Sequence, residues 1–174
     1  TLVFEYTIAN GNVASDLDYG GTASLVLNGG TIKDLAGNAA TLTLATPGAS
    51  GSLGASKAIV VDGVLPAISS LAGNGGSGSI ALTMSEAVTG SPDASDFTVS
   101  VGGNAVTVGS VGISGSTVTL TLANSSVIPN DSAVTVDYAQ NGTDSKKLAD
   151  GAGNYLATVA DPLSVTITDD NTDP

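Results

Sequence analysis

The stretch TVTLTL at Thr117–Leu122 decides the fold class of this chain. Successive side chains of a β-strand point to opposite faces, so three threonines fall on one face and three apolar residues on the other. Threonine and valine are β-branched and fit the pleated surface of a sheet. These six residues therefore predict a strand that buries one face and leaves the other in water.

The same alternation recurs on both sides of this strand. The alternating segments are 2–8, 23–27, 40–44 and 58–61, followed by 79–84, 97–101, 105–108, 133–138 and 163–168. Glycine-rich and asparagine-rich runs such as Gly73–Gly76 and Gly102–Asn104 separate them and supply the positive φ angles of tight turns. No segment shows a helical period. The pattern predicts an all-β fold of tandem immunoglobulin-like antiparallel β-sandwiches.

The segment Asp62–Pro66 marks the boundary between two of these sandwiches, because Pro66 cannot donate to a continuing ladder. Aspartate again precedes proline by four residues at the end of the chain, in Asp170–Pro174. We therefore expect one complete sandwich at 63–168, of the usual size of about a hundred residues. Residues 169–174 then form a linker to a following domain.

Residues 1–62 hold only about four alternating segments, too few to close an immunoglobulin-type sandwich. We expect this part to be the C-terminal part of such a sandwich. Either the chain starts inside a domain, or strands from another chain complete it. The motif Asp-x-Ala-Gly-Asn occurs at Asp34–Asn38 and again at Asp150–Asn154, and this repetition is typical of a tandem array.

The composition restricts the classes of function. Sixteen carboxylates face four lysines, which gives a net charge of -12 and disfavours nucleic acid and anionic membranes as partners. The chain has no histidine, cysteine or arginine, so the usual catalytic bases and nucleophiles are lacking and we expect no enzyme. No apolar run is long enough to cross a bilayer. An acidic surface of this kind attracts cations.

Two family resemblances follow from particular stretches. Residues 1–62 resemble the C-terminal half of the bacterial immunoglobulin-like repeats of giant type I-secreted, RTX-type adhesins. The stretches that carry this resemblance are Leu2–Ile8, Asp16–Tyr19, Leu27–Asp34, Ala36–Asn38 and Lys57–Asp62. Residues 66–168 resemble the repeat named for the cyanobacterial surface protein SwmB, through Ser85–Val88, Ala94–Val99, Val118–Leu122 and Leu148–Asn154. The resemblance implies an extracellular spacer at the cell surface.

Several carboxylates are expected to meet where two such sandwiches join. Strand counting places the loop with Asp16 and Asp18 at the pole from which the chain leaves the first sandwich. It places Glu86 and Asp150 at the pole where the chain enters the second. Like charges held together repel by on the order of 1 kcal/mol per pair, and Ca²⁺ with oxygen ligands removes that cost. The predicted ligands of this structural Ca²⁺ are Asp16, Asp18, Asp62, Glu86, Asp150 and Asn154.

A second group of carboxylate and amide side chains is expected to form half of the next junction. It consists of Asn130, Asp131, Asp169, Asp170, Asn171 and Asp173. The alternative for both groups is that these side chains are solvated loop residues that start turns and keep the protein soluble. Titration of calcium against melting temperature separates the two interpretations.

Two functions remain open from the sequence. The chain is either a structural extender of a surface adhesin, with neighbouring immunoglobulin-like domains as its partners, or a filament subunit whose first unit accepts strands from another copy. An extender is monomeric by size, whereas a strand-exchanging subunit polymerises.

Overall fold

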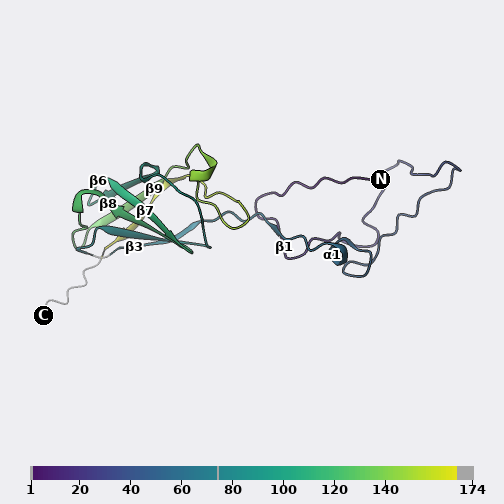
Figure 1. Ribbon diagram of the computed structural model, residues 1–174, viewed down its shortest axis with the longest axis horizontal. Helices are drawn as coiled ribbons and strands as arrows, with labels where there is room; N and C mark the ends of the chain where they lie inside the picture. Colours follow the sequence, from purple (N-terminus) through teal and green to yellow (C-terminus); the bar gives the residue numbers. More distant parts are fainter. Residues whose placement is uncertain (1, 74, 168–174) are drawn as a thin grey trace. The chain divides into compact units, whose positions relative to one another are not determined.

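The computed structural model describes residues 2–73 and 75–167. The chain forms two compact units, Thr1–Val64 and Leu65–Pro174 (Figure 1). Among the described residues, strands in antiparallel sheets make up most of the regular secondary structure, and the α-helical content is a single four-residue helix. The prediction of an all-β fold is therefore confirmed. Nowhere in the described chain is a helix long and apolar enough to cross a membrane.

The second unit contains two antiparallel sheets. Its strands are β3 (Ile68–Gly73), β4 (Ser79–Met84), β5 (Phe97–Val101), β6 (Asn104–Val106), β7 (Val108–Ser114), β8 (Thr117–Leu122), β9 (Ala133–Tyr138) and β10 (Val159–Thr166). Over the described residues, one sheet has the order β3-β4-β8-β7 and the other β10-β9-β5-β6. Taken in chain order, this is the strand arrangement of an immunoglobulin-type sandwich with one added strand, β6, beside β5.

The core of this sandwich lies between the two sheets. In β8, Val118 and Leu120 are fully buried while Thr121 is exposed, as the alternation of TVTLTL predicts. The rings of Phe97 and Tyr138 pack at a tilt of 41° with centroids 5.1 Å apart. Apart from these two aromatic residues, aliphatic side chains and Met84 fill the core. One sandwich core is therefore filled although the chain has few aromatic residues.

Four strands of the second unit coincide with segments predicted from the sequence: β4, β5, β8 and β9. The segment 105–108 instead spans the end of β6 and the start of β7, and β10 lies earlier than predicted, with residue 168 outside the described residues. The strand β3 and most of β7 were missed. Both are edge strands rich in serine and glycine, so their pairing with β4 and β8 defines them more than their own alternation does.

The first unit has little regular structure. It contains β1 (Val13–Ala14), the helix α1 (Leu53–Ser56) and β2 (Val61–Asp62), and β1 pairs with β2. The predicted strands at 2–8, 23–27 and 40–44 are wrong, because within residues 2–64 these segments do not pair into a sheet. The helix was not predicted. It is a single turn capped by Ser52, whose hydroxyl accepts a hydrogen bond from the Ala55 amide at 3.1 Å.

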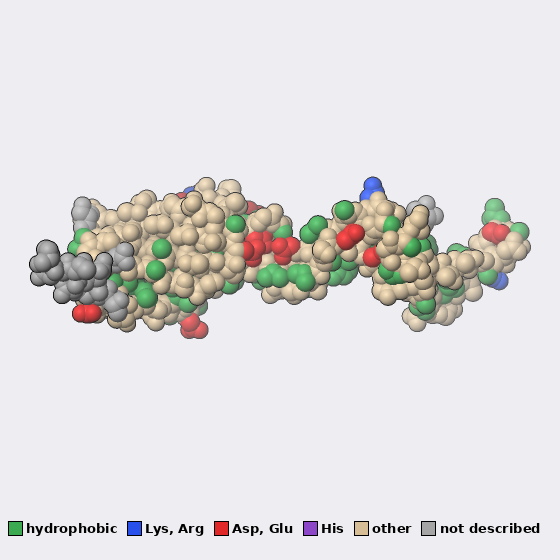
Figure 2. All heavy atoms as spheres, turned by 90° about the horizontal axis from the view of Figure 1, so that it is seen from below, with side chains coloured by type: hydrophobic (Ala, Val, Ile, Leu, Met, Phe, Trp, Pro, Cys, Tyr) green, Lys and Arg blue, Asp and Glu red, His purple; other side chains and the backbone are tan. Residues whose placement is uncertain are grey.

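Large apolar side chains of the first unit lie at its surface. Val3 is 87% exposed, Phe4 76% and Val26 72%. Green hydrophobic atoms of this unit are visible in Figure 2. An alternating segment buries its apolar face only against a second layer, and the described part of this unit supplies none. The second unit has two layers and buries the same kind of residue.

Candidate cation-binding site

Two loops of the second unit carry the carboxylates of the candidate site. Glu86 lies in the loop after β4, and Asp150 lies in the turn between η3 (Asp144–Lys146) and β10. The two loops are joined by the backbone of Thr89 and Ala149, which exchange hydrogen bonds of 2.7 and 2.9 Å. This pairing fixes the distance between two segments that are far apart in sequence.

Asp150 is held rigidly within its turn. Its side chain is 4% exposed and accepts hydrogen bonds of 2.8 Å from the amides of Ala152 and Asn154 and from the Asn154 Nδ2. Gly153 adopts a φ of 92°, which lets the turn close around the carboxylate. Burial raises the pKa of Asp150, but these hydrogen bonds, the Asn154 side chain foremost, outweigh burial and lower the pKa below its ordinary value. The group is therefore a carboxylate at neutral pH.

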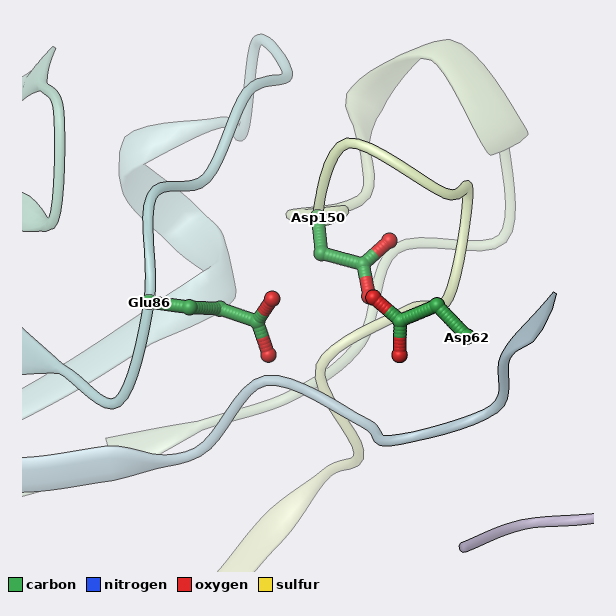
Figure 3. Close-up of side chains that lie close together, drawn as sticks. All are labelled: Asp62, Glu86 and Asp150. Carbon is green, nitrogen blue, oxygen red and sulfur yellow. The ribbon is translucent and has the colours of Figure 1, made fainter. Parts of the chain in front are cut away.

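Glu86 directs its side chain toward Asp150, as Figure 3 shows. One carboxylate oxygen of each residue lies within 4.8 Å of the other. Two negative charges at this separation repel by roughly 1 to 4 kcal/mol, between the dielectric of water and that of a protein surface. A divalent cation bound between the two carboxylates would remove this repulsion, because hard cations prefer carboxylate oxygens as ligands.

Asp62 is the third side chain drawn in Figure 3. It ends β2, is half-buried, and its Oδ1 accepts a hydrogen bond of 3.1 Å from the Val64 amide. It lies three residues before Leu65, the first residue of the second unit. Its predicted role as a calcium ligand stays a prediction.

Asp16 and Asp18 contact the backbone of their own unit. Asp18 accepts hydrogen bonds from the Tyr19 amide at 2.9 Å and the Gly48 amide at 3.0 Å, and Asp16 accepts one from the Ile59 amide at 3.3 Å. Burial raises the pKa of Asp18, but hydrogen bonds from Gly48, Ser52 and other donors lower it overall. These acids therefore anchor the loop around α1, and their predicted role as calcium ligands stays a prediction.

The remaining predicted ligands fall into three groups. Asn154 supports Asp150 through its amide and its Nδ2. Asn130 and Asp131 are exposed in the turn before β9, where Asp131 has a φ of 57°. Asp169, Asp170, Asn171 and Asp173 lie outside the described residues.

One polar network of the second unit was missed by the sequence analysis. Lys146 pairs with Asp93 at 2.6 Å, and the Asn141 Nδ2 donates to both Asp93 and Asp96. The Asp96 Oδ2 also accepts a hydrogen bond of 2.8 Å from the Asp93 amide. The network ties the loop before β5 to the loop after β9. No local motif indicates the contacts of Lys146 and Asn141 with these acids, because the partners are 45 to 53 residues apart.

The lowered pKa of Asp150 predicts a pH dependence of stability. The carboxylate contributes stability that is fully present above its ordinary pKa of 3.8 and is lost as the pH falls through the lower pKa of the folded state. The free energy of unfolding of wild type is expected to exceed that of Asp150→Asn by about 1–3 kcal/mol at neutral pH. Urea unfolding with chelator present, repeated from about pH 7 to pH 2, measures this difference.

The difference is expected to stay constant down to about pH 5 and to shrink below the ordinary pKa. Asp161→Asn, which removes an exposed carboxylate on β10, is the matched control and is expected to change stability by less than about 0.5 kcal/mol at any pH. If the difference in stability between wild type and Asp150→Asn grew on acidification, the pKa of Asp150 would not be lowered in the folded state.

The second unit matches a family of repeats. Residues 79–143 match the SWM_repeat family, "Putative flagellar system-associated repeat". The match begins at β4 and ends after β9, so it includes Glu86 and stops short of Asp150. It lies inside the stretch 66–168 that resembles the SwmB-type repeat, and it covers less than half of the chain.

Two solved structures of bacterial S-layer proteins are similar to this chain. One is the N-terminal part of the S-layer protein SbsC, at 22% identity and a TM-score of 0.48, over 60% of this chain and 24% of that one. The other is the S-layer protein rSbsC(31-844), at 22% identity and a TM-score of 0.49, over 61% of this chain and 14% of that one. None of the curated proteins matches the chain.

Proposed function

We propose that this chain is a structural extender module of a large bacterial cell-surface adhesin. In this proposal it lies outside the cell, joins other immunoglobulin-like domains end to end, and has no catalytic activity. Ca²⁺ bound at the junctions stiffens the array. The match of residues 79–143 to a repeat family and the immunoglobulin-type strand order support a modular role.

The observation that carries the calcium proposal is the close approach of Glu86 and Asp150, whose carboxylate oxygens lie within 4.8 Å. Asp62 would be the third ligand. It precedes Ala67 by five positions in the chain, a span of at most about 18 Å. Ala67 is itself hydrogen-bonded to Ser85, the neighbour of Glu86, by contacts of 2.7 and 3.0 Å. This short connection is what would allow Asp62 to act as the third ligand.

The expected affinity is that of an extracellular module, roughly 10⁻⁴ to 10⁻³ M. Calcium at ten to a hundred times that constant would stabilise the folded state by about 1.4–2.7 kcal/mol. Because one ligand belongs to the connector, the same binding would restrict motion about the joint. Stiffness and stability would therefore respond together to calcium.

Calcium titration of the full chain tests the proposal. Raising calcium from chelator to about 10 mM is expected to increase the melting temperature of the second unit by several degrees in wild type. Glu86→Gln is expected to lose at least half of this shift, since it removes one ligand charge and keeps the shape of the side chain. Differential scanning calorimetry measures both.

Asp161→Asn serves as the control because it removes the same charge from an exposed position on β10, and its calcium shift is expected to equal that of wild type. Magnesium at the same concentration controls for general screening of the acidic surface and is expected to give a smaller shift. Equal calcium responses in wild type and Glu86→Gln would refute the site.

A second candidate function is a subunit of an extracellular filament assembled by strand complementation between chains. The observation that favours it is the exposure of apolar side chains in the first unit, such as Val3 and Phe4. Size-exclusion chromatography with light scattering over a hundredfold range of concentration distinguishes the two functions. An extender stays monomeric, and a filament subunit grows in mass.

A further inference from the structure

The two units contain the same small hairpin. In the first unit it is 32–40, and in the second it is 148–156. The Asp34 amide donates a hydrogen bond of 3.0 Å to the Asn38 carbonyl, and the Asp150 amide donates one of 3.0 Å to the Asn154 carbonyl. The outer hydrogen bonds also match. The Ala40 amide donates to the Ile32 carbonyl at 2.9 Å, and the Leu156 amide donates to the Leu148 carbonyl at 2.8 Å.

The side chains inside the two turns correspond as well. The Asp34 carboxylate accepts hydrogen bonds of 2.8 Å from the amide and the Nδ2 of Asn38, as Asp150 does from Asn154. Gly37 and Gly153 have φ angles of 90° and 92°. The hairpins are therefore structurally equivalent, so the surroundings of one indicate what the other is shaped to contact.

In the second unit a neighbouring segment lies along this hairpin. The chain that leaves β4 reaches Thr89, which exchanges two backbone hydrogen bonds with Ala149. Val88 of the same segment is 3% exposed, and the hairpin residues Leu148 and Leu156 are 1% and 2% exposed. The segment 79–89 thus completes both the backbone pairing and the apolar core on this side of the hairpin.

Within residues 2–64, no segment of the first unit pairs with the corresponding side of the hairpin. Over the described residues, Lys33 takes the place of Ala149 and forms one bridge, to Ala39. Ile32 is only half-buried and Ala40 is exposed, at the places of Leu148 and Leu156. The first unit also has a hollow of about 310 Å³, which is lined by Phe4, Tyr19, Ser24, Leu25, Leu44 and Leu53. A backbone edge and an apolar hollow therefore belong to the same unit.

We propose that this face binds an extended polypeptide segment with the chemistry of Ser79–Thr89. Such a segment has apolar side chains at every second position, then an acidic residue, then a residue that pairs in antiparallel fashion with Lys33. This is recognition by β-strand addition, in which the backbone edge gives affinity and the apolar hollow gives selectivity. By the correspondence of the hairpins, the acidic residue of the segment would lie near Asp34, as Glu86 lies near Asp150.

The test uses the full chain and a synthetic peptide of the sequence SIALTMSEAVT, residues 79–89. Amide hydrogen exchange at Lys33 is the readout, because its counterpart Ala149 donates to the Thr89 carbonyl. Saturating peptide is expected to slow exchange at Lys33 about tenfold or more. Exchange at Ala149 is expected not to change, which gives an internal reference in the same molecule.

Two controls make the result specific. A peptide with Leu82→Asp and Met84→Asp, at positions that are 1% and 3% exposed in the sandwich, is expected to give no protection. In the protein, Leu25→Asp in the hollow is expected to abolish the effect. Val26→Asp, at an exposed neighbour that lies outside the hollow, is expected to leave the effect unchanged.

Three outcomes overturn the proposal. The first is unchanged exchange at Lys33 at every peptide concentration. The second is equal protection by the control peptide. The third is protection of Lys33 without peptide that rises with protein concentration, which would mean that a second copy of the chain covers this face.

Discussion

Replacing Gly90 with alanine is expected to lower the free energy of unfolding of the second unit by about 3 kcal/mol or more. Gly90 has a φ of 134°, a conformation that residues with a Cβ rarely adopt. A Cβ at this position would overlap the carbonyl oxygen of Lys147 and lie 3.1 Å from its carbonyl carbon. Backbone atoms cannot rotate away as a side chain does, so one of the two segments must move.

The cost matters for the candidate site because Gly90 follows Thr89, whose pairing with Ala149 joins the two acidic loops. Urea unfolding followed by circular dichroism measures the effect. Gly151→Ala is the matched control, since no atom lies within 4 Å of its would-be Cβ and its φ is not positive. It is expected to change stability by less than about 0.5 kcal/mol. Equal unfolding midpoints for the two variants would show that the close approach at Gly90 relaxes freely.

Leu120→Ala is expected to destabilise the second unit by about 2–5 kcal/mol. Leu120 is fully buried at the centre of β8, with β4 on one side and β7 on the other. Truncation removes the transfer free energy of the lost methyl groups and leaves a cavity that the paired strands cannot collapse. The measurement is again urea unfolding, with the midpoint as the readout.

Thr121→Ala is the control for this position, because Thr121 is the next residue of the same strand and its side chain is exposed. The expected cost is less than about 1 kcal/mol, from β-propensity alone. A Leu120→Ala cost no larger than that of Thr121→Ala would mean that the two sheets do not enclose a common core.

The alternation of the central strands was readable from the sequence because it reflects which side of each residue faces the core. In β8 and β9 every second residue is apolar, and these strands lie where they were predicted. The edge strand β3, ISSLAG, has no comparable pattern. Its backbone pairs with β4, and pairing of this kind depends on a neighbour rather than on the strand's own composition.

The first unit shows the reverse case. Residues 2–8 have a clear alternation, yet they are not part of a sheet among the described residues. Alternation gives a segment the capacity to form a strand, but a ladder needs a partner backbone and a layer to cover the apolar face. The sequence pattern therefore overstated the regular structure of this unit.

For the candidate site, counting strands was enough to place Glu86 and Asp150 at the same end of the second sandwich. It did not separate these two acids from Asp16 and Asp18, which look alike in sequence but accept hydrogen bonds from the loop around α1. The network of Lys146, Asp93 and Asn141 gave no signal at all. Contacts between distant loops depend on the packing of the whole sandwich.

By itself the sequence determined the all-β class, the central strands of the second unit, and the turn that holds Asp150. These features follow from local rules, namely the two-residue period of a strand and the turn chemistry of Asp, Gly and Asn. Only the tertiary structure decided which carboxylates face one another, which edge strands complete the sheets, and which hairpin of the two is covered. These features depend on contacts between residues that are far apart in the sequence, and such contacts leave no local sequence pattern.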